Sequence, residues 1–178
     1  MRVALLLLSV ALAAQSAAVN KSRLNKSGDA VYAPLWLYNG TWQITRKDLA
    51  PGAKPDQLVN QCALIGKYFA CQQTVNGEQG SLIVFIPGNK PGQYYTQSIT
   101  PQGRATGRQD LEISGDHWIY SSTWDQGGTT IYYRTTNVFT GKNHIHFEQL
   151  ESPNGTQWSV KNTGDEVHVS NSGAKVER

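Results

Sequence analysis

The stretch HIHFE carries three side chains that could bind a metal ion. His144, His146 and Glu148 occupy alternate positions, so in a β-strand they project from one face at intervals of about 7 Å. Two imidazoles and a carboxylate form a ligand set that a divalent ion such as Zn²⁺ accepts. The same alternation is typical of the solvated face of a surface strand. The sequence therefore supports two interpretations of these residues, a metal site and a polar strand surface.

Tyr132 and Arg134 form a second group with binding chemistry. They lie two residues apart in the stretch TTIYYRTTNVF, so in a strand both point to the same side. A guanidinium offers two parallel donors and a phenol a third, which suits the acidic head group of a ligand in an aromatic cavity. An unpaired Arg inside a protein is costly. The alternative is that Arg134 pairs with an internal carboxylate or stacks on a Trp.

Cys62 and Cys71 are the two cysteines of the chain, and they flank a turn signal. In NQCALIGKYFACQQ, the pair Gly66-Lys67 matches a two-residue hairpin turn with Gly at its first central position. Pairing outward from this turn sets Cys62 opposite Cys71, at a place where side chains approach closely. The spacing predicts a structural disulfide that fixes the register of the hairpin.

Sequence patterns of common catalytic centres are missing from the chain. There is no Gly-x-Ser-x-Gly motif, which marks the nucleophile of one class of hydrolases. Asp116 and His117 are adjacent, but neighbouring residues of a strand point to opposite faces, so we expect no acid–histidine relay there. The sequence predicts no catalytic residue and no cofactor.

The elements that position all these residues are predicted to be β-strands. Turn signals containing Gly, Pro and Asn recur at short intervals, and the segments between them are rich in Val, Ile, Thr, Tyr and Trp. This pattern is typical of antiparallel sandwiches and barrels. Sequential hairpins favour an all-β, up-and-down meander, and closure into a barrel of about 8–10 strands would leave no unpaired edge. The expected strands span residues 36–46, 57–65, 68–75, 81–86, 92–99, 104–113, 117–124, 129–139, 143–151 and 157–163.

The loop lengths between the last strands predict which side chains face the interior. We expect a three-residue loop at 126–128 and a two-residue turn at 141–142, because these lengths place alternate residues of four strands on one shared face. A two- or four-residue loop after Trp124 would instead turn the side chains of the strand that contains Trp124 to the opposite face from those of the other strands. The predicted inner face is aromatic with one charge and comprises Trp118, Tyr120, Ser122, Trp124, Tyr132, Arg134, Thr136, Val138, Ile145, Phe147, Trp158 and Val160. From it we expect ligand contacts by Trp118, Tyr120, Trp124, Tyr132, Arg134 and Phe147, while His144, His146 and Glu148 fall on the outer face.

Gly40-Thr41-Trp42, in the first expected strand, resembles the Gly-x-Trp signature that begins the first strand of lipocalins and their calycin relatives. With the strand pattern, this makes the chain similar to secreted calycin-type proteins, closest to exported bacterial families of unknown function that share this barrel. The Thr-Asp-Tyr segment of lipocalins is absent, and TGRQDL stands about where it would lie. The resemblance implies a lipocalin-like barrel, and fatty-acid-binding calycins use an Arg and Tyr pair comparable to Arg134 and Tyr132.

The N-terminal stretch MRVALLLLSVALAAQSAAVNKS has the organisation of a secretory signal peptide. Arg2 is followed by an apolar run from Val3 to Ala14 and then by small residues, and this run is too short for a stable membrane span. We expect a signal peptide at residues 1–18, a partly disordered lead-in at 19–34, a β-barrel domain at 35–170 and a flexible tail at 171–178. The mature protein is expected to be secreted, to the periplasm or out of the cell, without an integral membrane span.

Basic residues outnumber acidic residues by three, 16 against 13. No basic run is longer than Arg46-Lys47, whereas nucleic-acid binding requires a clustered basic patch. The charge therefore predicts no nucleic-acid partner.

Three functions fit these observations. The leading hypothesis is a secreted protein that binds a small apolar or amphipathic, possibly acidic, ligand inside the barrel. The alternatives are a structural or interaction module with a filled interior, and a metal-dependent protein built on His144, His146 and Glu148. The volume of the interior separates the first two, because small-molecule sites occupy roughly 300–1,000 Å³.

Overall fold

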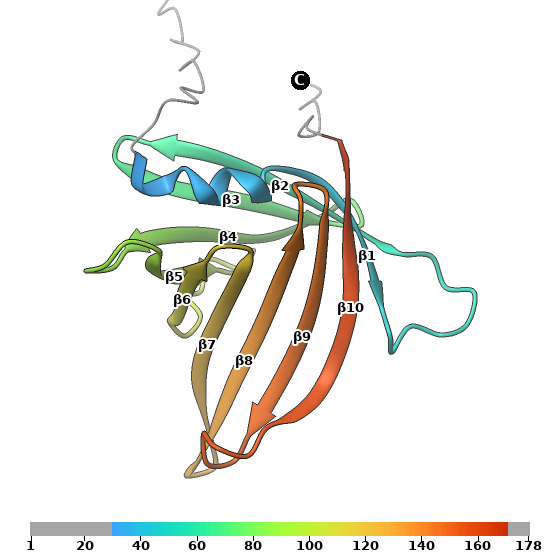
Figure 1. The fold of residues 1–178 in the computed structure, drawn as a ribbon, viewed down its shortest axis with the longest axis vertical. Helices are drawn as coiled ribbons and strands as arrows, with labels where there is room; N and C mark the ends of the chain where they lie inside the picture. Colours follow the sequence, from blue (N-terminus) through green and yellow to red (C-terminus); the bar gives the residue numbers. More distant parts are fainter. Residues whose placement is uncertain (1–29, 171–178) are drawn as a thin grey trace, which may run out of the picture.

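The computed structural model describes residues 30–170. Ten antiparallel strands follow one another as a meander and close into a barrel, which confirms the predicted fold class (Figure 1). The predicted signal peptide, residues 19–29 of the lead-in and the C-terminal tail lie outside the described residues. The strands are β1 (Gly40–Arg46), β2 (Asp56–Ile65), β3 (Tyr68–Val75), β4 (Glu78–Pro87), β5 (Gln93–Ile99), β6 (Gln109–Ser114), β7 (His117–Gln126), β8 (Thr129–Thr140), β9 (His144–Ser152) and β10 (Ser159–Ser170).

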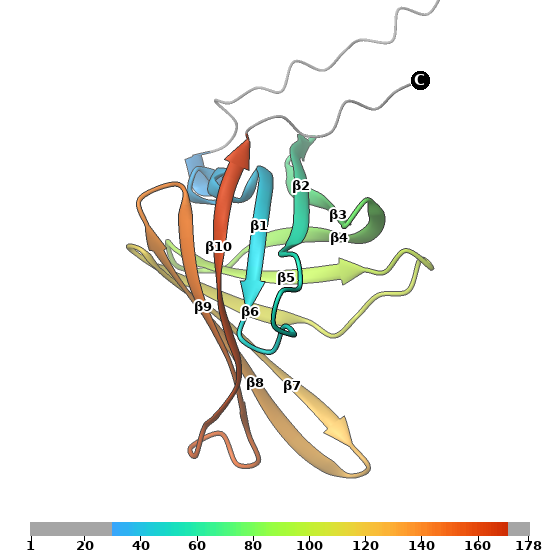
Figure 2. The same cartoon turned by 90° about the vertical axis from the view of Figure 1, so that its right-hand side faces the viewer.

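The barrel closes where its first and last strands meet. β1 pairs with β10 on one side and with β2 on the other (Figure 2), so every strand has two neighbours and no edge is left unpaired. Trp42 of the Gly-x-Trp segment is fully buried at this seam. Its ring lies 4.7 Å from that of His168 in β10, and its Nε1 donates to the Tyr38 carbonyl at 3.0 Å.

Two short 3₁₀-helices, η1 (Ala30–Tyr32) and η2 (Pro34–Tyr38), cover one end of the barrel. A strand beginning at residue 36 was expected here, and this prediction was wrong, because residues 34–38 form η2 and β1 begins at Gly40. Side chains three residues apart line up on a 3₁₀-helix, and Tyr32, Leu35 and Tyr38 have this spacing. Tyr32 and Leu35 are buried, and Tyr94 of β5 holds the helix by donating to the Val31 carbonyl.

The β2–β3 hairpin has the predicted register and disulfide. Cys62 lies opposite Cys71 and the two are bonded, with their Cα atoms 4.0 Å apart. Gly66 has the positive φ, 64°, that the two-residue turn requires. The bond joins two neighbouring strands of the wall, and both cysteines are buried.

The register of β8 differs by one residue from the prediction on both of its sides. The β7–β8 turn has two residues, Gly127 and Gly128, so Gln126 pairs with Thr129. Both glycines have positive φ, 63° and 86°, as a type I′ turn requires. The β8–β9 turn has three residues rather than two, and Thr140 pairs with His144.

A shift of one residue moves every side chain of a strand to the other face. Trp118 therefore pairs with Asn137, and Asn137 pairs with Phe147. The inner face of β8 consists of its odd-numbered residues, and Tyr132 and Arg134, expected inside, lie on the outer face. Thr136 and Val138 share the outer face with them.

Three further residues expected inside lie outside the barrel: Trp124, Val160 and Trp158, whose ring stacks on Arg134 at the outer face. β7 to β10 extend beyond β1 to β6, and β7 and β8 end in a hairpin there (Figure 1). Trp124 on this extension is 62% exposed. Val160 is 55% exposed, because β10 has a bulge between Val160 and Asn162 that changes which residues face inward. β10 continues to Ser170, seven residues beyond its predicted end at Thr163.

Candidate functional site

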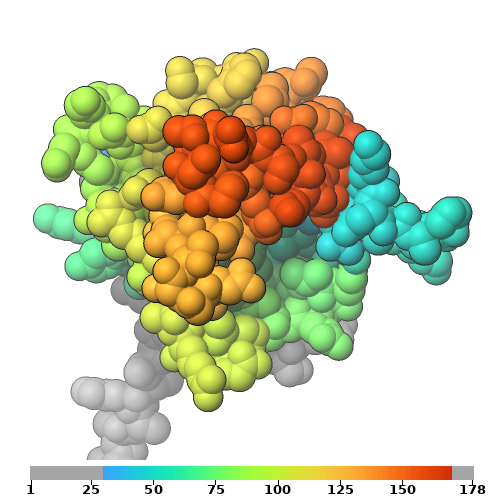
Figure 3. All heavy atoms as spheres, turned by 90° about the horizontal axis from the view of Figure 1, so that it is seen from below, coloured from blue at the N-terminus to red at the C-terminus, as the bar shows by residue number. Residues whose placement is uncertain are grey.

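The barrel contains an open cavity of about 310 Å³ below the 3₁₀-helices. Its apolar wall includes Ile44, Leu58, Ile83, Phe85 and Phe147. Alternate residues of a strand point to the same face, so these side chains share the inner side of the sheet. Figure 3 views the molecule from the end opposite the helices, where the β1–β2 segment projects to one side.

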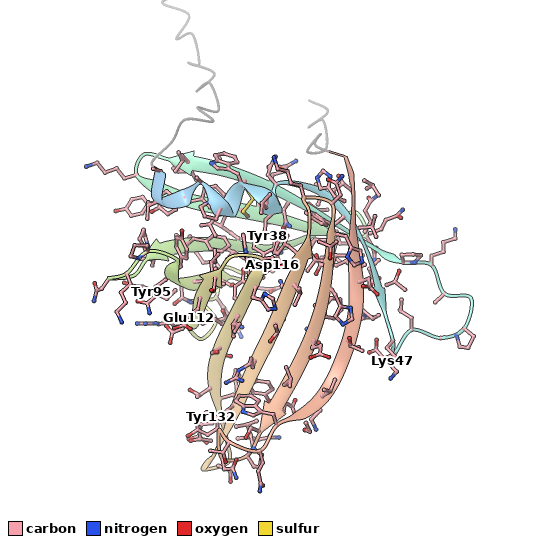
Figure 4. The ribbon with its side chains drawn as sticks, viewed as in Figure 1. Tyr38, Lys47, Tyr95, Glu112, Asp116 and Tyr132 are labelled. Carbon is pink, nitrogen blue, oxygen red and sulfur yellow. A yellow bond between two sulfur atoms is a disulfide. The ribbon has the colours of Figure 1, made fainter. Side chains whose placement is uncertain are left out.

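Tyr38 brings a polar group into the centre of the barrel from the end of η2 (Figure 4). Its hydroxyl accepts hydrogen bonds from the Tyr120 hydroxyl at 2.8 Å and from Asn137 Nδ2 at 3.0 Å. Its ring packs edge-on against Trp118 at 4.9 Å and Phe139 at 6.1 Å. Burial raises the pKa of both the Tyr38 and the Tyr120 phenol. Both phenols are therefore neutral at physiological pH, and the Tyr38 O–H is still available as a donor.

Asn137 of β8 presents an unused acceptor to the cavity. The residue is 6% exposed and lines the cavity. Its amide nitrogen donates to Tyr38, whereas its Oδ1 is buried without a hydrogen-bond partner. A buried polar atom left unpaired costs about 1–3 kcal/mol, and a ligand with a donor at this place would remove that cost.

Glu166 of β10 places a carboxyl group in the same cavity. It lies opposite Ile44 of β1 and Ile145 of β9, both apolar. Burial raises the pKa of Glu166 to about 7. The Glu166 carboxyl and the two tyrosine hydroxyls also interact electrostatically. A carboxyl group with this pKa changes its charge near neutral pH.

Arg46 is the basic residue of the cavity lining, and its charge is already compensated. Its guanidinium lies 3.6 Å from Asp48 and 3.5 Å from Asp56, with 41% of the side chain exposed. The neighbouring strands β2 and β3 contribute a side-chain hydrogen bond of 3.1 Å from Gln73 to Asn60. The cavity is therefore apolar over much of its wall, with polar groups at defined places.

The predicted ligand-binding residues are divided between the two sides of the wall. Tyr120 and Phe147 line the cavity, and Trp118 supports Tyr38 from within the core. Tyr132 lies at the far end of the β7–β8 extension (Figure 4). Arg134 lies in a groove on the outer face, where its guanidinium stacks on the Trp158 ring at 4.1 Å. The stacking alternative for Arg134 is the one observed, but outside the barrel.

His144 and His146 both contact one carboxylate on the outer face of β9. His144 Nε2 and His146 Nδ1 each lie 3.1 Å from Asp165 Oδ1. Across residues 30–170, no group of three or more His, Cys, Asp and Glu residues is arranged to hold a metal ion. A metal site that includes Glu148 stays a prediction from the sequence, and the observed contacts form a surface network around Asp165.

Asp116 and His117 interact, contrary to expectation. Asp116 Oδ1 lies 2.7 Å from His117 Nδ1. Asp116 belongs to the turn that precedes β7, so the alternation of a strand does not apply to it. Both side chains are exposed. The hydrogen bond with His117 lowers the pKa of the Asp116 carboxyl.

The sequence analysis missed three polar residues of the cavity, Tyr38, Asn137 and Glu166. Asn137 was hidden by the register error in β8, and the two-residue Gly127-Gly128 turn was the signal that would have placed it inside. Glu166 lies beyond residue 163, where the last expected strand ends, so no face was assigned to it. The alternation in GDEVHVS could have indicated that the last strand continues, with Glu166 and His168 on one face.

Comparisons with known proteins identify the fold and no family. No family model and no curated protein matches the chain. The crystal structure of Rv2717c from M. tuberculosis is similar, with a TM-score of 0.50 and 12% sequence identity over 80% of this chain and 99% of that one. This likeness supports the barrel fold alone. Within residues 30–170, no helix has the length and apolar character needed to cross a membrane.

Proposed function

We propose that this protein binds a small amphipathic molecule inside its barrel. The observation that carries the proposal is the cavity of about 310 Å³ in the barrel, whose lining is mostly apolar with a few fixed polar groups. This composition is typical of small-molecule sites, and the volume lies near the lower limit of about 300 Å³ for such sites. The ligand is therefore small.

The arrangement of the polar groups supports binding over a filled structural core. A structural core satisfies its buried polar atoms, whereas here the Asn137 Oδ1 has no partner and Glu166 faces apolar side chains. The rigid surroundings of Tyr38, packed between aromatic rings, hold these groups in place before a ligand arrives. Such preorganisation reduces the entropic cost of binding.

We also propose that the protein is secreted. The Cys62–Cys71 disulfide supports this location, since disulfides persist mainly in oxidising compartments. The organisation of residues 1–18 as a signal peptide is a second argument. N-terminal sequencing of the exported protein tests it, and a chain that keeps Met1 after export would contradict the proposed cleavage.

Two measurements test ligand binding. Native mass spectrometry of protein purified from its own source should show an added mass that disappears on denaturation. Titration with the fluorescent apolar probe N-phenyl-1-naphthylamine should give saturable binding of one probe per chain. A mass equal to that of the bare chain, together with linear and unsaturable probe fluorescence, would contradict the proposed function.

A further inference from the structure

The interior cavity contains hydrogen-bond acceptors that the barrel leaves unused. Asn137 Oδ1 is buried without a partner, and within the described chain the Glu166 carboxylate has no Lys, Arg or His within ion-pair distance. Asn137 donates to the Tyr38 hydroxyl, and Glu166 lines the same cavity and interacts electrostatically with that hydroxyl. The cavity therefore offers two acceptors that a ligand with donors can satisfy.

We propose that the ligand is a small amphipathic amine, with its ammonium group at Glu166 and Asn137 and its apolar part against Ile44, Ile83 and Phe85. This inference rests on the proposed function. An ammonium group has three donors and no acceptor, so it satisfies both unused acceptors. A hydrogen bond between two charged groups is also about twice as strong as one between neutral groups.

An acidic ligand does not fit this cavity. Arg134, which was expected to bind an acidic head group, lies on the outer face and stacks on Trp158. Arg46 lines the cavity but is already engaged by Asp48 and Asp56. A ligand carboxylate would lie beside Glu166, and two carboxylates in one partly buried site disfavour each other's ionisation.

The amine should bind more tightly as the pH rises through about 7, where Glu166 ionises. The other titratable groups around Glu166 do not reverse this direction. Tyr38 and Tyr120 stay neutral because burial raises the pKa of both, and Arg46 is engaged by Asp48 and Asp56. His168 lies two residues further along β10 and packs on the ring of Trp42, while β9 presents an apolar residue to Glu166.

Three ligands with one alkyl chain and different head groups test the inference. Hexylamine, 1-hexanol and hexanoate would compete with bound N-phenyl-1-naphthylamine at pH 8 and at pH 5.5. At pH 8 we expect hexylamine to bind about tenfold more tightly than hexanol, and hexanoate most weakly. At pH 5.5 the ratio of amine to hexanol affinity should approach one. Glu166→Gln should bring the ratio to one at pH 8, whereas Asp165→Asn, next to it on the outer face, should leave the ratio unchanged.

The outcomes separate this inference from the proposed function. Competition by hexanol as strong as by hexylamine at pH 8, or a preference for hexanoate, would overturn the amine assignment alone. Failure of all three ligands and of the probe itself would overturn the proposed function and the amine assignment with it.

Discussion

Asp165 and Glu166 are neighbours in β10, yet they lie in opposite environments. Asp165 is on the outer face, where 49% of its side chain is exposed and two histidines lie 3.1 Å from its carboxylate. Glu166 faces the cavity between apolar side chains of β1 and β9, and burial raises its pKa to about 7. The outer carboxylate has two histidine partners, and the inner carboxylate has no ion-pair partner among the described residues.

β8 shows the same contrast between its faces. Arg134 is outside and stacks on Trp158, whereas Thr135 and Asn137 are inside and line the cavity. In both strands the chemistry of a residue depends on its face and not on its type alone. The register that assigns residues to faces therefore decides where a ligand can bind, and variants matched across the wall test this most sharply.

The largest effect is expected from filling space on the inner side of β10. A Cβ atom at Gly164 would lie 2.2 Å from the Thr45 carbonyl oxygen and 2.8 Å from Cζ of Phe147, a cavity residue. Gly164→Ala should therefore lower the free energy of unfolding by about 3 kcal/mol. Urea denaturation measures the change. Gly107→Ala, at a position open to solvent, is the control and should change stability by less than about 0.5 kcal/mol.

The next effect concerns the pH dependence of stability. The pKa of Glu166 rises from 4.5 to about 7 on folding, so its stabilising contribution is complete below pH 4.5 and is lost as the pH rises through 7. The loss amounts to up to about 3 kcal/mol. Relative to wild type, Glu166→Gln should therefore gain up to this amount between pH 4.5 and pH 8, measured by urea denaturation at each pH. A constant difference between the two proteins across this range would show that the Glu166 carboxyl is solvated.

A smaller effect is expected in the outer groove. Arg134→Ala removes the stacking on Trp158 and should lower the free energy of unfolding by about 1 kcal/mol. Binding of N-phenyl-1-naphthylamine should not change, because Arg134 is absent from the cavity lining. If the affinity for the probe falls severalfold in this variant, Arg134 lies inside the barrel, where the register expected from the sequence places it.

The smallest effect is expected from the outer carboxylate. Asp165→Asn weakens its contacts with His144 and His146, all three of which are largely exposed. Exposed ion pairs contribute roughly 0–1 kcal/mol, so the melting temperature should fall by only a few degrees or less. Loss of cooperative unfolding in this variant would mean that the outer network has a structural role that its exposure does not indicate.

The fold could be predicted because its signals are local and repeated. Turn residues punctuate the chain at short intervals, and Cys62 and Cys71 fix one hairpin by a covalent bond that agrees with the Gly66 turn. Which residues of β8 face inward was harder to predict. It depends on the lengths of the β7–β8 and β8–β9 turns, and a change of one residue in either turn reverses the faces. The sequences QGG and GKN are compatible with two- and three-residue loops alike.

The cavity itself could be predicted only in part. Tyr120 and Phe147 were placed inside correctly, because errors of one residue on the two sides of β8 cancel for β7 and β9. Tyr38 reaches the interior from a 3₁₀-helix that packs against strands far along the chain. Its role depends on long-range contacts that no local pattern contains.

Two adjacent threonines of β8 provide the most direct test of the central claim that the inner face of this wall lines a ligand cavity. Thr135 lines the cavity, and Thr136 lies on the outer face. Thr135→Phe and Thr136→Phe add the same bulky side chain to opposite faces of the wall. Titration with N-phenyl-1-naphthylamine compares the binding of the probe by the two variants. The account predicts that binding is lost, or weakened at least tenfold, in Thr135→Phe and unchanged in Thr136→Phe. Equal binding by both variants, or loss in Thr136→Phe alone, would contradict it.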